Sequence, residues 1–197
     1  MIAAVKKCLM AEAQALLSLA NSIDSETLIP FLDRLSNCKG KRCFTGVGKS
    51  LIVAQKIADS FSSIGYSSIV IDPLSALHGN LGVLSANDIV VAISNSGETD
   101  ILIDSLNHIV SMGVEIVSIT GNEDSTIAKL SSCHYLVNTN EAGAFGIVPS
   151  STTTAVVALG DAFLCALIVR DNLTVEDFYK FHPRGALARR DNSEPFP

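Results

Sequence analysis

From residue 42 onward, short apolar runs rich in β-branched residues alternate with longer segments of helical periodicity. This alternation constrains the fold more than any other feature of the sequence. The predicted strands cover residues 42–45, 68–71, 89–93, 115–119 and 135–137. The predicted helices between them cover residues 49–64, 99–112 and 125–132. Continuous β-branched runs are typical of strands buried on both faces, and strand–helix alternation requires right-handed crossovers. The pattern therefore predicts a doubly wound parallel sheet in an α/β fold.

Further helices are predicted on both sides of this alternating region. They cover residues 2–20, 25–38, 151–169 and 174–181, and the first of them is amphipathic. The Gly- and Ala-rich segment 141–149 follows the last strand and precedes the long apolar helix. The polar segment 191–197, which contains two prolines, is predicted to be a disordered tail. No internal repeat or second domain is expected.

The charge balance and the cysteines exclude several classes of protein. Lys and Arg total 14 against 20 Asp and Glu, so the formal net charge is −6. Nucleic acid is not expected as a partner, because its recognition needs a basic face. The five cysteines are scattered, odd in number and free of any C-x-x-C pair, so neither a disulfide framework nor a zinc cluster is expected.

Two further observations concern location. The first residues lack the basic-then-apolar order of a signal peptide. The most apolar stretch, 155–169, is interrupted by Gly160 and Asp161 and is shorter than the roughly 18 residues of a membrane span. We therefore predict a soluble cytoplasmic protein with no membrane partner.

Two polar segments follow predicted strands and lead directly into helices. They are Gly46–Ser50 and Ser94–Thr99. In a doubly wound sheet, ligands bind at the carboxyl ends of the strands, where helix N-termini favour anions. Simple helix capping, with Ser96 as the cap, would explain one hydroxyl residue of the second segment. A run of Ser, Asn, Ser and Thr around a glycine exceeds that need and indicates phosphate binding.

Gly46–Ser50 ends in the letters of a nucleotide P-loop but matches neither nucleotide motif. The P-loop pattern requires a glycine where this chain has Cys43, and the dinucleotide fingerprint requires a third glycine where it has Leu51. What remains is a tight turn with Lys49 at the start of a helix. A surface lysine is the simpler interpretation, but a cation against the helix dipole is better explained by an anion bound beside it.

Four histidines and one glutamate are candidates for chemistry. His108 and His134 lie within a predicted helix and at a predicted strand, where ordinary or satisfied side chains are expected. His78 and His182 lie on predicted loops. For each of them, a functional role and a purely structural role are about equally expected. Glu141 follows the fifth predicted strand and so falls at the ligand edge of the sheet.

Several separated motifs in this order resemble the sugar isomerase (SIS) domain, most closely the arabinose-5-phosphate isomerases. The motifs are the two polar segments, Ala76–Gly82, Pro149–Thr154 and Phe178–Gly185. The resemblance implies a flavodoxin-like α/β/α sandwich of three layers with a five-stranded parallel sheet. It covers residues 39–190 as the SIS domain, with residues 1–38 as N-terminal helices that serve oligomerisation. The family commonly continues into CBS domains, so the chain resembles the short form without them.

The resemblance also implies an activity and a site. The reaction is the interconversion of D-ribulose 5-phosphate and D-arabinose 5-phosphate, without a cofactor, in a homotetramer whose sites are completed across subunit boundaries. The positions that match the family's phosphate site are Gly48, Ser50, Ser94, Asn95, Ser96 and Thr99. The positions that match its proposed catalytic groups are Lys49, His78, Glu141 and His182.

Three departures from the family pattern matter. Ile101 stands where a glutamate implicated in catalysis is usual. Asp72 replaces a histidine that can bind zinc, so no metal is expected. Arg184 and Ala188 stand in a motif that is richer in glycine elsewhere in the family.

In the mechanism that we expect, an enediol lies between aldose and ketose. Glu141 is the predicted enediol base, with His78 as the alternative, and Lys49 stabilises the carbonyl oxygen. His78 and His182 are the candidates for ring opening and proton relay. The rival functions are another phosphosugar isomerisation, such as that of 6-phospho-3-hexulose, and a non-catalytic sugar-phosphate sensor.

Overall fold

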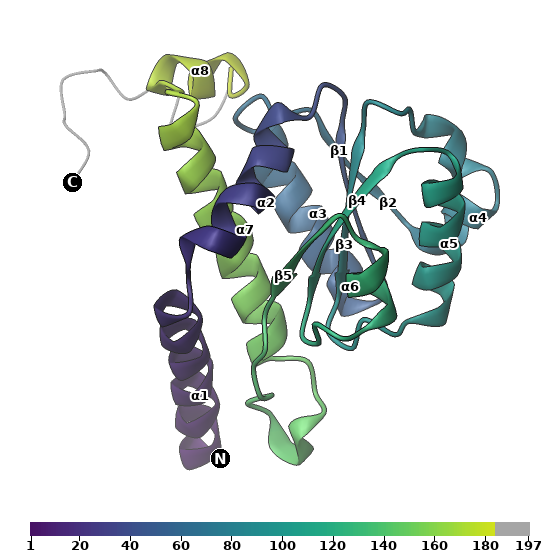
Figure 1. The fold of residues 1–197 in the computed structure, drawn as a ribbon. Coiled ribbons are helices and arrows are strands. Elements are labelled where there is room, and N and C mark those ends of the chain that lie inside the picture. Colours follow the sequence, from purple (N-terminus) through teal and green to yellow (C-terminus); the bar gives the residue numbers. More distant parts are fainter. Residues whose placement is uncertain (184–197) are drawn as a thin grey trace.

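The computed structural model describes residues 1–183, and its centre is one five-stranded parallel sheet of order β2-β1-β3-β4-β5 (Figure 1). The strands are β1 (Arg42–Gly46), β2 (Ser68–Ile71), β3 (Ile89–Ser94), β4 (Glu115–Thr120) and β5 (Cys133–Leu136). Every residue of β1 and β3 is buried, as expected for central strands covered on both faces. The predicted α/β fold with its parallel sheet is therefore confirmed.

Helices cover both faces of the sheet and complete three layers (Figure 1). One layer holds α2 (Ser25–Asn37), α3 (Lys49–Ser62) and α7 (Ser151–Arg170). The opposite layer holds α4 (Pro73–Leu77), α5 (Asp100–Ser111) and α6 (Thr126–Leu130). In the first layer, the rings of Phe31, Tyr135 and Phe163 meet with centroids 5.1–5.7 Å apart and join α2, β5 and α7.

Two regions differ from the sequence prediction. The segment 76–82 was expected to be a loop, but α4 and a 3₁₀ helix over Asn80–Val83 occupy this region. The carboxylate of Asp72 accepts hydrogen bonds from the backbone amides of Leu74 and Ser75, and Pro73 begins the helix. The last strand begins at Cys133, two residues before its predicted start. The prediction missed these first two residues because they are only half-buried and do not continue the apolar run.

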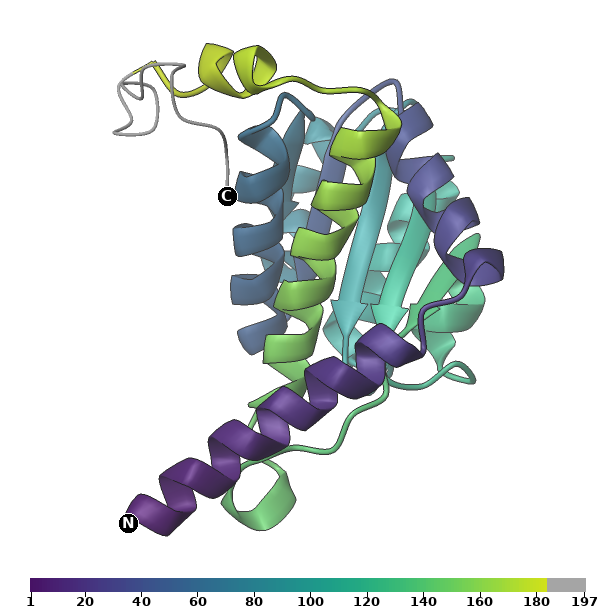
Figure 2. The ribbon, with the colours of Figure 1, turned by 90° about the vertical axis from the view of Figure 1, so that its left-hand side faces the viewer.

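The helix α1 (Ile2–Asn21) crosses the start of α7 and then extends beyond the sheet (Figure 2). None of its residues is buried. Glu12 accepts a hydrogen bond of 3.2 Å from Thr154 in α7. Large apolar side chains, including Ile2, Val5 and Leu9, are exposed along α1. The predicted helix is confirmed, and its role in oligomerisation stays a prediction.

The helix α7 is longer than the apolar stretch 155–169 because it begins with the polar residues Ser151–Thr154. Among residues 1–183 it is the one helix that is long and apolar enough to cross a membrane, by length and composition alone. In the structure, α7 packs against α1 and α3, and Leu159 and Phe163 are buried. Its packing is that of a core helix. The tail 191–197 lies outside the described residues.

The amino-terminal edge of the sheet is fixed by a buried carboxylate. Asp88 is 3% exposed and accepts hydrogen bonds from the backbone amides of Lys41 (2.7 Å) and Ser85 (2.8 Å). Its carboxylate also pairs with the Lys41 ammonium at 2.9 Å. Beside it, buried Arg42 donates to the carbonyl of Leu35 at the end of α2, at 2.8 Å. These contacts join α2, β1 and the start of β3.

We expect Asp88→Ala to lower the free energy of unfolding by about 3 kcal/mol, because two part-buried amides and the Lys41 ammonium lose their buried acceptor. Burial disfavours the charged carboxylate, but the hydrogen bonds from Lys41 and Ser85 outweigh it, so the pKa of Asp88 is lowered. A carboxylate with a lowered folded-state pKa stabilises fully above its unfolded value of about 4, and this stability is lost as the pH falls through the folded value.

Denaturant unfolding at pH 7 and at successively lower pH measures both effects. Asp88→Asn should flatten the decline in stability below about pH 4. An Asp88→Ala protein as stable as the unmodified chain would show that the carboxylate does not hold this edge.

Candidate functional site

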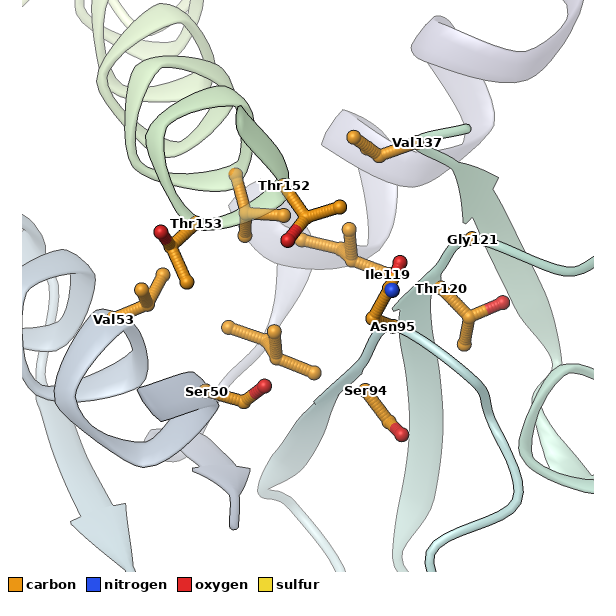
Figure 3. Close-up of a pocket in the computed structure, with 12 residues that line it drawn as sticks. Ser50, Val53, Ser94, Asn95, Ile119, Thr120, Gly121, Val137, Thr152 and Thr153 are labelled. Atoms are coloured by element: carbon orange, nitrogen blue, oxygen red, sulfur yellow. The ribbon is translucent and has the colours of Figure 1, made fainter. Parts of the chain in front are cut away.

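A cleft of about 360 Å³ opens at the carboxyl end of the sheet, beside the first turns of α3 and α7. A smaller, deeper hollow adjoins it and shares its Ser50, Asn95, Thr152 and Thr153 (Figure 3). The predicted site residues that line the cleft or the hollow are Lys49, Ser50, Ser94, Asn95 and Glu141. The structure therefore brings together residues from three distant parts of the sequence.

The turn between β1 and α3 exposes the N-terminus of the helix to this space. Gly46 allows a close approach, since a Cβ there would lie 2.9 Å from the Ile93 carbonyl oxygen. Gly48 has a φ of +60° and is the N-cap of α3, so no side chain caps the helix. Lys49 is exposed in the first turn and forms no ion pair with any residue in the range 1–183. The partial positive charge at the N-terminus of α3 and the ammonium group of Lys49 therefore both lie at the cleft.

Hydrogen bonds of its own hydroxyl groups fix the conformation of the segment between β3 and α5. Ser94 Oγ accepts a hydrogen bond of 3.1 Å from the Gly97 amide and lies 3.1 Å from Thr99 Oγ1. Ser96 Oγ accepts one of 3.2 Å from the Glu98 amide. The N-cap of α5 is Thr99, without a side-chain cap bond, so the simple interpretation of Ser96 as the cap is wrong. The first turn of α5 keeps its amides available for an anion.

Glu98 cannot take the place of the family glutamate that is missing at Ile101. Its carboxylate accepts a hydrogen bond of 2.7 Å from the Thr126 amide at the start of α6. This contact lowers the pKa of Glu98 and turns its carboxylate toward α6. Ile101 itself is half-buried in α5 and lines neither the cleft nor the hollow.

Glu141 lies in the cleft as predicted, and its carboxylate is surrounded by donors at the start of α7. It accepts hydrogen bonds from Ser150 through the amide (2.8 Å) and the hydroxyl (3.0 Å), and from Thr152 through the amide (3.4 Å) and the hydroxyl. Burial disfavours the charged form, but these four bonds outweigh it, so the pKa of Glu141 is lowered. The group is a stable carboxylate.

The two loop histidines lie outside the cleft of their own chain. His78 is exposed at the end of α4 and does not line the cleft. His182 follows α8 (Val175–Lys180), which lies at the far end of α7 from Glu141 (Figure 1). Its ring stacks on Phe178 with centroids 3.8 Å apart. Of the four catalytic candidates, Lys49 and Glu141 therefore line the cleft within one chain, whereas His78 and His182 do not, and their catalytic roles stay predictions.

Other predicted positions have structural roles. Asp72, at the position where the family can bind zinc, caps α4 instead. Among residues 1–183, no three His, Cys, Asp or Glu side chains lie together as metal ligands would. His134, expected to be satisfied, shares a hydrogen bond of 2.9 Å with Thr120 Oγ1. Arg184 and Ala188 lie outside the described residues.

Three threonines around the site were not predicted as site residues, although two of them lie in the motif Pro149–Thr154. Thr120 lines the deeper hollow, and Thr152 and Thr153 line both the hollow and the cleft. Thr120 ends β4 at the same sheet edge, and the two other threonines begin α7. A polar residue that ends a buried strand is the signal that could have identified Thr120.

The model of the SIS domain family matches residues 34–166, which include all five strands and every residue that lines the cleft. The chain belongs to the SIS domain family. Among solved structures, this SIS domain superposes with a TM-score of 0.88 on a protein of Escherichia coli CFT073 described in complex with arabinose 5-phosphate. That match is 33% identical and covers 92% of this chain and 97% of the other.

Two curated relatives carry the name arabinose 5-phosphate isomerase. KpsF of Escherichia coli O6:H1 is 35% identical over 191 residues, which is 96% of this SIS chain. KdsD of Salmonella typhi is 38% identical over 159 residues, which is 80% of it. The SIS chain matches 58% of the length of the first relative and 48% of the second.

Proposed function

We propose that this SIS domain is an aldose–ketose isomerase that interconverts D-ribulose 5-phosphate and D-arabinose 5-phosphate. The observation that carries the proposal is the meeting of three features at one cleft: an uncapped helix start, Lys49, which has no ion pair within residues 1–183, and the polar end of β3. Relatives named arabinose 5-phosphate isomerase support the choice of reaction. A cytoplasmic location fits the five free cysteines.

The phosphate group occupies the side of the site formed by the starts of α3 and α5. Backbone amides of the first helical turns and small hydroxyl groups are the donors that a dianionic phosphate requires. The proposed phosphate ligands are Gly48, Ser50, Ser94, Asn95, Ser96 and Thr99. Binding energy from this remote group holds the reacting carbons in place.

Lys49 is placed to stabilise the oxyanion that develops on the sugar during enediol formation. Histidines exchange protons near neutral pH, which suits ring opening and proton transfer. His78 and His182 therefore act from neighbouring copies in a homotetramer, with the exposed apolar face of α1 among the contacts. His78 is the base that this scheme favours, because the carboxylate of Glu141 is already held by four hydrogen bonds.

A non-catalytic sugar-phosphate sensor is the second candidate, and one observation favours it. The family acid is absent at Ile101, and Glu98 does not replace it because its carboxylate binds the Thr126 amide. A sensor would keep the phosphate site and lose proton transfer.

Incubation with ribulose 5-phosphate in deuterated water separates these functions. An isomerase yields arabinose 5-phosphate with deuterium at C2, detected by NMR, because the proton added at C2 of the enediol comes from a base in exchange with solvent. Binding without exchange indicates the sensor. Conversion of 6-phospho-3-hexulose but not of the pentulose indicates the other isomerisation.

A further inference from the structure

The loop 142–149 forms one wall of the cleft and is tied together at its two ends. Glu141 precedes it, and the donors on its carboxylate, Ser150 and Thr152, follow it. The Ala142 amide donates a further hydrogen bond of 2.9 Å to Ser150 Oγ. Between these ends, Gly146, Ile147 and Pro149 line the cleft, as Lys49 does from α3. The position of this wall therefore depends on contacts made by one carboxylate.

Large apolar side chains between the two ends of the loop are exposed. Ile147 is 77% exposed and Phe145 is 90% exposed. Phe145 also has a φ of +73°, in the left-handed region that disfavours residues with a side chain. A backbone hydrogen bond of 3.2 Å joins the Gly146 amide to the Gly143 carbonyl beside the 3₁₀ turn Ala144–Gly146. The contacts of Glu141 are the ones that tie the two ends of this wall to each other.

The carboxylate also completes the N-terminus of α7. The first turn of this 20-residue helix has no cap from the side chain of its own N-cap residue, Ser150. Glu141 supplies the missing acceptor from nine residues earlier in the chain, to the amides of both Ser150 and Thr152. A negative group at a helix start is stabilising, so the wall and the helix share one anchor.

These contacts leave the carboxylate poorly suited to abstract a proton. One oxygen accepts from the Ser150 amide, the Ser150 hydroxyl and the Thr152 amide, and the other accepts from the Thr152 hydroxyl. A general base needs a lone pair directed at the substrate, and hydrogen bonds to the charged form weaken it as a base.

We propose that Glu141 is a positioning residue for the isomerisation proposed above: it holds the loop 142–149 as a wall of the cleft that Lys49 also lines, and it does not itself transfer a proton. This inference rests on the proposed function for its kinetic part. The position of the loop is a property of the chain alone and can be measured without substrate.

Two variants test the proposal: one changes the acceptor of these hydrogen bonds and the other removes one of their donors. Glu141→Gln removes the charge, and Thr152→Val removes a donor hydroxyl but leaves the carboxylate in place. Each should raise KM for ribulose 5-phosphate about 10-fold and lower kcat less than about 10-fold, since hydrogen bonds to charged groups are worth roughly this much. The double variant should be little worse than the poorer single one, because both lose one shared contact.

The acid limb of the pH profile of kcat/KM is the second readout. It should be retained in Glu141→Gln, because another group supplies the base. If Glu141 is the base, its loss should lower kcat by about 10²–10⁴-fold with little change in KM, and should remove that limb. Thr152→Val would then keep a normal kcat. That combination overturns the proposal.

Limited proteolysis of the loop without substrate gives a measurement that does not depend on activity. Cleavage within 142–149 should be about 10-fold faster in both variants than in the unmodified chain. Asp24→Asn is the matched control, since Asp24 caps α2 through the Thr27 amide at 2.8 Å and does not line the cleft. Unchanged loop protection in Glu141→Gln overturns the inference, whereas an unmodified chain with no isomerase activity overturns the proposed function. If Glu141→Gln does not fold, Thr152→Val still provides both measurements.

Discussion

Replacing Lys49 by methionine should lower kcat/KM for ribulose 5-phosphate by about 10²–10³-fold, the loss typical of removing one preorganised oxyanion donor. The ammonium lies in the first turn of α3 and lines the cleft, without an ion pair in the part of the chain that the structure describes. Methionine keeps the apolar stem and removes only the charge. Steady-state kinetics with product detection measure the effect.

The thermal stability of the Lys49→Met protein should not fall with its activity. A lysine at a helix start opposes the dipole, so Lys49→Met should leave Tm unchanged or raise it slightly. Lys56→Met is the matched control on the same helix, because Lys56 pairs with Asp161 in α7 and does not line the cleft. If Lys49→Met retains full activity, or loses activity only as much as Lys56→Met does, Lys49 has no electrostatic role in the reaction.

The double variant Ser96→Ala, Thr99→Ala should raise KM by about 100-fold while kcat falls much less. Each lost hydrogen bond to a charged phosphate costs about 1.5–3 kcal/mol. Neither hydroxyl caps α5. Ser94 is left intact because its hydroxyl accepts from the Gly97 amide and shapes the loop. KM for the sugar phosphate and the inhibition constant of inorganic phosphate should change together.

Ser111→Ala is the control for this pair. Ser111 lies at the other end of α5, where its hydroxyl donates to the His108 carbonyl. Its KM should stay within error of the unmodified chain. Unaltered affinity of the double variant for both phosphate compounds would show that the anion binds elsewhere.

The strands were predictable because their apolar runs report burial on both faces directly. The short helix α4 was not, since five residues are too few for periodicity to appear. Its start could have been recognised from Asp72 and Pro73, a cap followed by a proline at the first helical position. The early start of β5 was missed because its first residues are only half-buried.

The site followed from topology more than from any motif. Parallel strands end at one edge, so Lys49, Ser94 and Glu141 had to come close once the sheet order was known. The distance of His182 from Glu141 followed from the length of the predicted helix that became α7. A helix of about 20 residues carries the chain roughly 30 Å from the cleft. The hydrogen bonds of Glu141 could not be predicted, because they depend on how a glycine-containing loop closes.

The buried carboxylate of Asp88 and the guanidinium of Arg42 lie at the sheet edge away from the cleft, where the strands begin. The residues that stabilise the fold at Asp88 and Arg42 therefore lie at one end of the sheet, and the residues that line the cleft lie at the other end. Substitutions in the lining of the cleft therefore leave the contacts of Asp88 and Arg42 in place. A laboratory search for altered substrate preference can thus mutate the cleft heavily and still recover folded protein.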